Sequence, residues 1–436
     1  MNIVLQILFA ICLGIGAYFA YRNFSKISRN INLGKDKDIS DNPSVRWNTM
    51  FRVAFGQSKM LTRPIPAILH LFVYVGFVVI NIEVLEIIID GLFGTHRVLS
   101  FLGSVYSILI GTFEFLAVLV LVGVICFWVR RNVMNIKRFN QPELEGSPKK
   151  DANIILYAEV VLMSAFLIMN AADFILQERG VEHYVKAGVF PISQYIAVLL
   201  EGMSSDNLTL LERSMWFFHF IGILVFMNYL PFSKHLHIIL AFPNTYFSNL
   251  EAKGGFSNLE SVTNEVKLML DPNAIPVEAT GPVRFGVKDV QDLSWKNLLD
   301  AYSCTECGRC TSECPANQTG KLLSPRKIMM STRDRLEEVG RNIDANAGTF
   351  VEDTKTLLHD YITPEELWAC TTCNACAEAC PININPLEII IDLRRYLIME
   401  ESSAPTSLNN MFTNIENNMA PWQFSPADRL NWATED

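Results

Sequence analysis

Eight of the ten cysteines lie in two short runs in the last third of the chain. Both runs have the spacing C-x2-C-x2-C-x3-C-P, and their members are Cys304, Cys307, Cys310 and Cys314, then Cys370, Cys373, Cys376 and Cys380. Four thiolates at this spacing are typical ligands of a 4Fe–4S cluster. Zinc also binds thiolates, but it explains a single C-x2-C pair better than two complete runs that each end in proline. The spacing therefore predicts two 4Fe–4S clusters.

The fourth cysteine of each run is predicted to bind the cluster of the other run. Three closely spaced cysteines can surround one cluster, and in two-cluster ferredoxins the fourth cysteine ligates the second cluster. The expected ligands of the first cluster are Cys304, Cys307, Cys310 and Cys380. The expected ligands of the second cluster are Cys370, Cys373, Cys376 and Cys314.

The elements that must position these groups begin with a membrane bundle. Hydrophobic residues make up 50% of the chain, and its net charge of −9 argues against nucleic acid as a partner. Five apolar stretches are long enough to cross a bilayer: residues 3–21, 66–90, 102–129, 153–176 and 212–240. The first stretch has no basic region before it and no cleavage site after it, so we expect a retained helix.

Loop charge predicts the orientation of this bundle. Connections 22–65 and 130–151 carry nine and six Lys or Arg residues, whereas connections 91–101 and 177–211 carry one and two. Basic loops stay in the cytoplasm. We therefore expect a multi-pass protein of the bacterial inner (cytoplasmic) membrane, with its N-terminus outside and both cysteine runs in the cytoplasm.

The expected fold is mainly α: a five-helix transmembrane bundle followed by an α-helical two-cluster ferredoxin domain. We assign residues 1–245 to the transmembrane domain, 246–290 to a linker, 291–400 to the ferredoxin domain and 401–436 to a tail that docks a partner. Residues 45–58 form an amphipathic segment suited to the headgroup layer, and 190–203 are expected to cap the outer face. Helices are predicted to start at Ser324-Pro325, Thr363-Pro364 and Asn385-Pro386.

Histidines inside the spans indicate haem b, because an intramembrane imidazole is costly unless it is functional. His70 and His237 lie at matching depth near the cytoplasmic ends of the second and fifth spans, so they are predicted to ligate one haem. His219 precedes His237 by 18 residues. That is about 27 Å along a continuous helix, so His219 would mark a second haem. The alternative for His219 is a polar link between helices.

The segment FHFIGILVFMNYLPFSKHLHI resembles the last helix of the respiratory nitrate reductase gamma subunit. The resemblance implies two haems b, with His219 and His237 as ligands. That family has a second histidine on helix two where this chain has Ile80. His96 is the expected substitute partner of His219, with His183 as a weaker one. The alternative for His96 is a solvated loop residue.

Three acidic residues on the second span, Glu83, Glu86 and Asp90, fall near one helical face. Carboxylates within spans often belong to proton or substrate sites, and a quinone exchanges two protons with every two electrons. Pairing with Arg97 or Arg213 is the alternative. The sequence leaves both interpretations open.

The segments SWKNLLDAYSCTECGRC and LWACTTCNACAEACPININP resemble the heterodisulfide reductase C-subunit. The complete layout resembles heterodisulfide-reductase-like membrane iron–sulfur oxidoreductases, which include electron-transfer-flavoprotein:menaquinone oxidoreductases. In those proteins a cysteine-rich CCG domain often follows a segment like the tail ENNMAPWQFSPADRLNWATED. The resemblance implies that a separate CCG subunit docks on the ferredoxin domain.

The expected function is that of a subunit of a membrane-bound, quinone-linked oxidoreductase in a respiratory chain. It would pass electrons between a CCG-type or flavoprotein partner, two 4Fe–4S clusters, one or two haems b and menaquinone. For electron-transfer flavoprotein, the warrant is family analogy alone. One alternative is the reduction of a cytoplasmic disulfide-like acceptor by quinol. Another is a membrane iron–sulfur redox sensor or scaffold.

Overall fold

The computed structural model describes residues 3–271, 273, 275 and 284–434. Residues 1–2, 272, 274, 276–283 and 435–436 lie outside the described residues, and they include part of the predicted linker and the end of the predicted tail. The described chain is helical, and its only β-bridges are the isolated pairs Lys35–Ser294 and Leu358–Ile362. The mainly α fold predicted from the sequence is confirmed.

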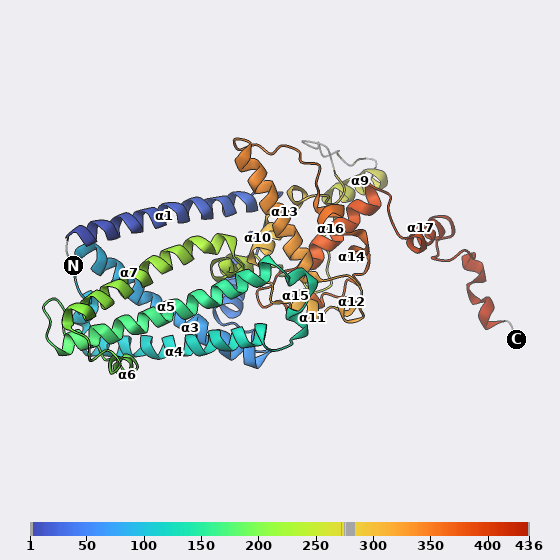
Figure 1. Cartoon of the computed structure of the whole chain (residues 1–436). Coiled ribbons are helices and arrows are strands. Elements are labelled where there is room, and N and C mark those ends of the chain that lie inside the picture. Colours follow the sequence, from blue (N-terminus) through green and yellow to red (C-terminus); the bar gives the residue numbers. More distant parts are fainter. Residues whose placement is uncertain (1–2, 272, 274, 276–283, 435–436) are drawn as a thin grey trace.

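Five helical segments among the described residues are long and apolar enough to cross a membrane. They are α1 (Ile3–Ile31), α3 (Pro64–Phe93), α4 (Ser104–Asn132), α5 (Ser147–Glu178) and Ser205–Phe232, which contains α7 (Ser205–Tyr229). The predicted number of five spans is therefore confirmed. Figure 1 shows these helices side by side in an elongated bundle, with the ferredoxin domain at one end.

Helix α1 packs closely on α3 and α7 through Phe9. The ring of Phe9 is buried, and its centroid lies 4.1 Å from that of Phe220. On α3, Gly91 makes room for this ring, because a Cβ at Gly91 would lie 2.4 Å from it. Most large apolar side chains on the outward faces of the bundle remain exposed, for example Ile7 and Val225, as expected of surfaces that contact lipid.

The fifth span ends earlier than the sequence analysis predicted. Helix α7 stops at Tyr229, and two 3₁₀ turns, Leu230–Phe232 and Lys234–Leu236, precede α8 (His237–Tyr246). Pro231 has no N–H to continue the helix, and Ser233 between the turns is extended. The prediction of one continuous helix over 212–240 is therefore wrong, and His219 and His237 lie on different helices.

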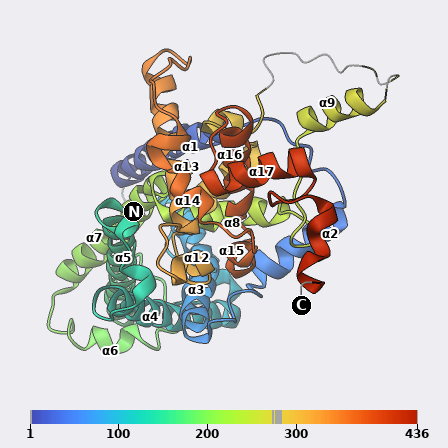
Figure 2. The ribbon, with the colours of Figure 1, turned by 90° about the vertical axis from the view of Figure 1, so that its right-hand side faces the viewer.

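The ferredoxin domain is a cluster of short helices around three longer ones. The longer helices are α10 (Trp295–Ser303), α13 (Pro325–Ala345) and α16 (Pro386–Met399), and the short ones are α11 (Arg309–Ser312), α12 (Pro315–Gln318), α14 (Pro364–Trp368) and α15 (Ala375–Ala379). Ser324, Thr363 and Asn385 cap α13, α14 and α16, as predicted from the Ser-Pro, Thr-Pro and Asn-Pro pairs. Figure 2 views the molecule from this end.

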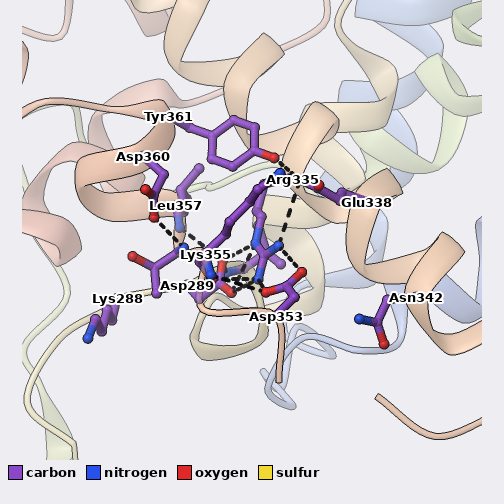
Figure 3. Close-up of polar contacts among 12 residues, drawn as sticks. Lys288, Asp289, Arg335, Glu338, Asn342, Asp353, Lys355, Leu357, Asp360 and Tyr361 are labelled. Carbon is purple, nitrogen blue, oxygen red and sulfur yellow. Dashed lines mark hydrogen bonds and ion pairs between the residues drawn. The ribbon is translucent and has the colours of Figure 1, made fainter. Parts of the chain in front are cut away.

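Arg335 on α13 joins three parts of the ferredoxin domain. Its guanidinium donates to the Asp289 and Asp353 carboxylates, each at 2.7 Å, and to the Lys355 carbonyl at 2.7 Å. Figure 3 shows this side chain in the centre of the polar network. The side chain of Arg335 is 0% exposed, so the network holds the segments before α10 and before α14 against α13.

The ferredoxin domain is also fixed to the bundle through α1. The amide of Asn30 donates to the Tyr302 hydroxyl at 2.9 Å, and Arg29 donates to the Gly340 carbonyl at 3.0 Å. Backbone hydrogen bonds join Lys35 to Leu293 and Trp295. The two predicted domains therefore share an extensive polar junction.

The remaining segments lie on the surface. The predicted amphipathic segment forms α2 (Pro43–Met50) and a π-helical turn (Phe51–Phe55), with Trp47, Phe51 and Phe55 about half exposed. The predicted cap contains α6 (Ser193–Ala197), which packs on α5. Helix α9 (Glu260–Leu270) lies within the predicted linker. The tail forms α17 (Thr406–Asn418) and a 3₁₀ helix (Pro426–Ala433) that project away from the rest of the chain (Figure 1).

Candidate iron–sulfur and haem sites

The thiols of the first predicted set, together with Cys376 of the second set, line one small cavity in the ferredoxin domain. Cys304 follows α10, Cys310 lies on α11, and Cys380 follows α15, where it faces the first run together with Pro381. Burial raises the pKa of Cys304 to about 12 and that of Cys380 to about 11. Bound iron would offset this cost, because it stabilises the thiolate form. The chemistry of the site thus fits a metal cluster.

The thiols of the second predicted set also lie together. Cys376 interacts electrostatically with Cys370, Cys373 and Cys314, although Cys314 comes from the first run. The fourth cysteine of each run therefore interacts with cysteines of the other run, Cys314 with Cys370 and Cys376, and Cys380 with Cys307 and Cys310. The assignment of one cluster to each set stays a prediction. In the described ranges, no three His, Cys, Asp or Glu side chains converge as they would on a single metal ion.

The two cysteine loops repeat the same unusual backbone conformation. Glu306 and Gly308 have φ of 55° and 71°, and the equivalent residues of the second run, Thr372 and Asn374, have φ of 55° and 59°. Such left-handed residues turn the chain sharply. The backbone N–H of Thr372 donates to the Cys370 sulfur at 3.4 Å. The loops therefore form two equivalent sulfur cradles.

His70 and His237 face each other at the end of the bundle next to the ferredoxin domain. Their ring centroids lie 6.4 Å apart, with 43° between the ring planes. His70 Nδ1 lies 3.1 Å from Oε1 of Gln57, and His237 Nδ1 donates to the Lys234 carbonyl at 3.1 Å. Each imidazole is thereby oriented through Nδ1, which leaves Nε2 for a ligand. Burial lowers the pKa of His237, so its ring is in the neutral form that binds iron.

The histidines predicted for a second haem are arranged differently. His219 is buried on α7 and donates from Nδ1 to the Leu162 carbonyl at 3.0 Å. His96 accepts a hydrogen bond from the Val185 N–H at Nδ1, and its Nε2 lies 3.1 Å from Asp173. Both nitrogens of His96 are therefore engaged, and no ring contact joins His96 to His219 in the described chain. His96 thus has no nitrogen left for iron in this arrangement, because Asp173 and Val185 occupy both.

A loop between α2 and α3 connects His70 with the first cysteine set. Within this loop, Gln57 contacts His70, and the Lys59 ammonium donates to the Ala377 carbonyl at 3.3 Å and to Asn383 at 3.1 Å. From the cysteine run, Arg309 donates to the Lys59 carbonyl at 3.0 Å. The sequence analysis missed these positioning residues; the basic loop and the arginine inside the cysteine run were the only local signals.

A second connection runs through Lys234. Its ammonium pairs with Glu306, which stands between Cys304 and Cys307, and its carbonyl accepts the His237 Nδ1 hydrogen bond. Glu306 also pairs with Arg333 of α13. The first cysteine set and the His70–His237 pair are thus held in one continuous polar framework.

Comparison with known proteins bears on the ferredoxin domain and on the whole chain. Residues 303–384 match the model of the 4Fe-4S dicluster domain. The probable iron-sulfur-binding oxidoreductase FadF of Bacillus subtilis is 29% identical over 433 residues, which cover 93% of this chain and 57% of that protein. The EtfAB:quinone oxidoreductase of Syntrophomonas wolfei is 27% identical over 421 residues, which cover 91% of this chain and 55% of that protein.

A third relative matches a shorter part of the chain. The C-subunit of the ferredoxin/F(420)H(2)-dependent CoB-CoM heterodisulfide reductase of Methanosarcina acetivorans is 33% identical over 108 residues, 24% of this chain and 52% of that protein. No solved structure matches the chain. The chain spans a little more than half the length of the first two relatives. The chain thus combines a match to the 4Fe-4S dicluster domain with five apolar helices, and it is similar to EtfAB:quinone oxidoreductase and to a heterodisulfide reductase subunit.

Proposed function

We propose that this chain is the membrane subunit of a quinone-linked oxidoreductase and passes electrons between a cytoplasmic partner protein and membrane quinone. The observation that carries the proposal is the His70–His237 pair, which lies beside the first cysteine set and is tied to it through Lys234 and Glu306. Two 4Fe–4S clusters and one haem b would supply one-electron transfer when bound. The side chains described above would hold these groups and tune their potentials.

The ligands of the haem would be His70 and His237. Haem iron is commonly held by neutral imidazoles, and metal-bound histidines usually donate their other N–H to an oxygen. Both rings meet the second condition, because His70 Nδ1 contacts the Gln57 Oε1 and His237 Nδ1 donates to the Lys234 carbonyl. His96 is not included among the proposed ligands because both of its nitrogens are engaged.

The two cysteine sets would occupy different places along the route. The set of Cys304, Cys307, Cys310 and Cys380 adjoins the bundle through Lys59 and Arg309. In the other set, Cys373 is exposed. A partner protein that delivers or collects electrons would therefore dock over the loop around Cys373. A CCG-type subunit or a flavoprotein is the proposed partner, and the name of the Syntrophomonas wolfei relative supports electron-transfer flavoprotein and quinone.

The location of the basic loops supports a cytoplasmic ferredoxin domain. Arg63, from the first basic loop, pairs with Glu313 at 2.8 Å. The carbonyl of Arg138, from the second basic loop, accepts a hydrogen bond from Arg326 at 2.7 Å. Both loops thus lie against the ferredoxin domain, and basic loops favour the cytoplasmic side.

Spectroscopy of the purified, full-length protein tests this proposal. We expect a haem b absorbance spectrum and, after chemical reduction, electron paramagnetic resonance signals of two 4Fe–4S clusters. A menaquinol analogue should reduce the haem in the isolated protein. Absence of haem from protein that contains both clusters would refute the role of the His70–His237 pair.

The similarity to a heterodisulfide reductase C-subunit favours a second candidate in which quinol drives the reduction of a cytoplasmic disulfide-like acceptor. The same redox groups would serve, with electrons flowing away from the membrane. The two candidates differ in the physiological reductant. If reduced flavoprotein reduces the haem faster than menaquinol does, in the presence of the partner protein, the first candidate is favoured; the reverse order favours the second.

A further inference from the structure

A small polar cavity lies at the end of the bundle far from the ferredoxin domain. Its volume is about 20 Å³, enough for one water molecule. The cavity is surrounded by α3, α5, α7 and the α3–α4 connection. The charged or titratable side chains that line it are Glu83, Glu86, Asp90, His96, Arg97, Asp173, Glu212 and Arg213.

The carboxyl groups around this cavity outnumber the cations. Five carboxyl groups and two guanidinium groups line it. His96 adds no cation in this arrangement, because its Nδ1 accepts a hydrogen bond from the Val185 N–H. Uncompensated carboxylates in a buried site are costly, and a buried group takes up a proton instead. The lining therefore favours at least one carboxyl group in its protonated form.

Four of the five carboxyl groups are held by hydrogen-bond donors, which favour the ionised form. Asp90 accepts from the backbone N–H groups of Arg97 and Val98 at 2.7 and 3.1 Å, and Asp173 accepts from Arg97 Nε at 2.7 Å. Glu86 accepts from the Leu99 N–H and the Tyr106 hydroxyl, both at 2.9 Å. Glu212 accepts from the Tyr184 hydroxyl and Arg213 Nη2, both at 2.9 Å.

Glu83 is different from the other four. Its residue is 3% exposed, and its Oε1 lies 3.7 Å from Arg97 Nη1, beyond hydrogen-bond distance. Its Oε2 is buried and has no hydrogen-bond partner among the described residues. The ionised side chain of Glu83 would lack the hydrogen-bond donors that stabilise a buried carboxylate. The protonated, neutral side chain needs fewer such donors. Glu83 is therefore the group best placed to carry the proton.

We propose that Glu83 is a proton-exchange residue of this bundle. Its carboxylic acid would give a proton to the cavity water and leave a carboxylate beside Arg97, and the reverse transfer would restore the acid. Thr95, which lines the cavity and is exposed, marks the route to the distal surface. Quinone takes up two protons with two electrons, and Glu83 could supply one of them. This use of the proton rests on the proposed function, whereas the protonation of Glu83 itself does not rest on it.

The titratable and charged groups that face Glu83 come from α3, α4, α5, α7 and the α3–α4 connection. They are Glu86 and Asp90 on α3, His96 and Arg97 in the connection, Tyr106 and Glu114 on α4, Asp173 on α5, and Glu212 and Arg213 on α7. Arg97 is the main cation among them and also donates to Asn170 at 2.8 Å. Its fixed position would stabilise the Glu83 anion during exchange.

Infrared spectroscopy of the full-length protein in lipid tests the proposal. The wild type should show the C=O band of a buried carboxylic acid that shifts in D₂O. Glu83→Gln should remove this band, and the matched control Glu86→Gln should keep it. Circular dichroism and the thermal unfolding midpoint verify that both variants fold.

Two outcomes would overturn the proposal: no such band in the wild type, or a band that survives in folded Glu83→Gln. Should Glu83→Gln not fold, ¹³C-glutamate labelling of the wild type keeps the proposal open to refutation, since a band that does not shift on labelling excludes Glu83. These readouts need no quinone. The quinone assignment has its own measurement: menaquinol-driven haem reduction should slow at least tenfold in Glu83→Gln, and an unchanged rate would overturn that assignment.

Discussion

Lys234 and Glu306 form an ion pair that joins the segment leading into His237 to the loop between Cys304 and Cys307. Their side chains are 9% and 3% exposed. Glu306 pairs with Arg333 as well, and the Lys234 carbonyl orients His237. The pair therefore couples the position of an imidazole at the membrane to that of a thiol cradle in the ferredoxin domain.

Replacing Lys234 should weaken this junction. Lys234→Met leaves a buried carboxylate with one cation fewer, and the loss of one partner of a buried pair costs about 3–5 kcal/mol. We expect a lower thermal unfolding midpoint and a lower haem content. Lys186→Met is the matched control: its ion pair with Glu178 is exposed, with Lys186 at 74%, and should contribute only about 0–1 kcal/mol. Equal stability of the two variants would contradict this role.

His237→Ala should abolish haem binding while both clusters remain, because the cysteine ligands lie in the other domain. His235→Ala is the control, since its ring lies 5.5 Å from that of His237 and is likewise partly buried. Haem absorbance together with the electron paramagnetic resonance signals of the reduced clusters checks both variants. Full haem content in His237→Ala would refute the assignment of this ligand.

The crossed arrangement of the cysteines predicts which cluster each substitution damages. Cys314→Ser should perturb the cluster held by Cys370, Cys373 and Cys376, and Cys380→Ser should perturb the other one. Electron paramagnetic resonance spectra of the reduced variants distinguish the signals of the two clusters. Damage confined to the cluster of the substituted cysteine's own run would show that the runs do not exchange ligands.

Arg335→Met should destabilise the ferredoxin domain. It leaves Asp289 and Asp353 without their shared cation, and breaking a buried network of this kind costs about 3–5 kcal/mol. Arg341→Met on the same helix is the control, because Arg341 is 69% exposed and its pair with Glu337 spans 3.7 Å. The thermal unfolding midpoint, followed by the visible absorbance of the clusters, should fall by several degrees in Arg335→Met and stay nearly constant in Arg341→Met.

Gly308→Ala should impair the first cluster. The added Cβ would lie 2.4 Å from Arg326 Nη1, and the positive φ adds about 1–2 kcal/mol of backbone strain. Gly320→Ala separates the two causes: Gly320 also has a positive φ, of 84°, but a Cβ added there would have no described atom within 4 Å. Iron content per protein should fall in Gly308→Ala and be retained in Gly320→Ala.

The sequence by itself determined the parts that depend on local order. Apolar length specified the five spans, because crossing a bilayer needs a continuous apolar run. Cysteine spacing specified two equivalent cradles, and Ser-Pro, Thr-Pro and Asn-Pro pairs specified three helix starts. Pro231 was a local signal too, and the break it causes after Tyr229 could have been predicted from its missing N–H.

Tertiary structure alone decided which distant residues meet. Two such outcomes depend on how the helices pack. Asp173 and Val185 occupy both nitrogens of His96, and Glu83 remains without a donor for Oε2 among the described residues. Periodicity shows which face of a helix is apolar, but a hydrogen bond depends on ångström-scale distances between elements far apart in the chain. Those distances are set by the packing of the folded bundle and its ferredoxin domain.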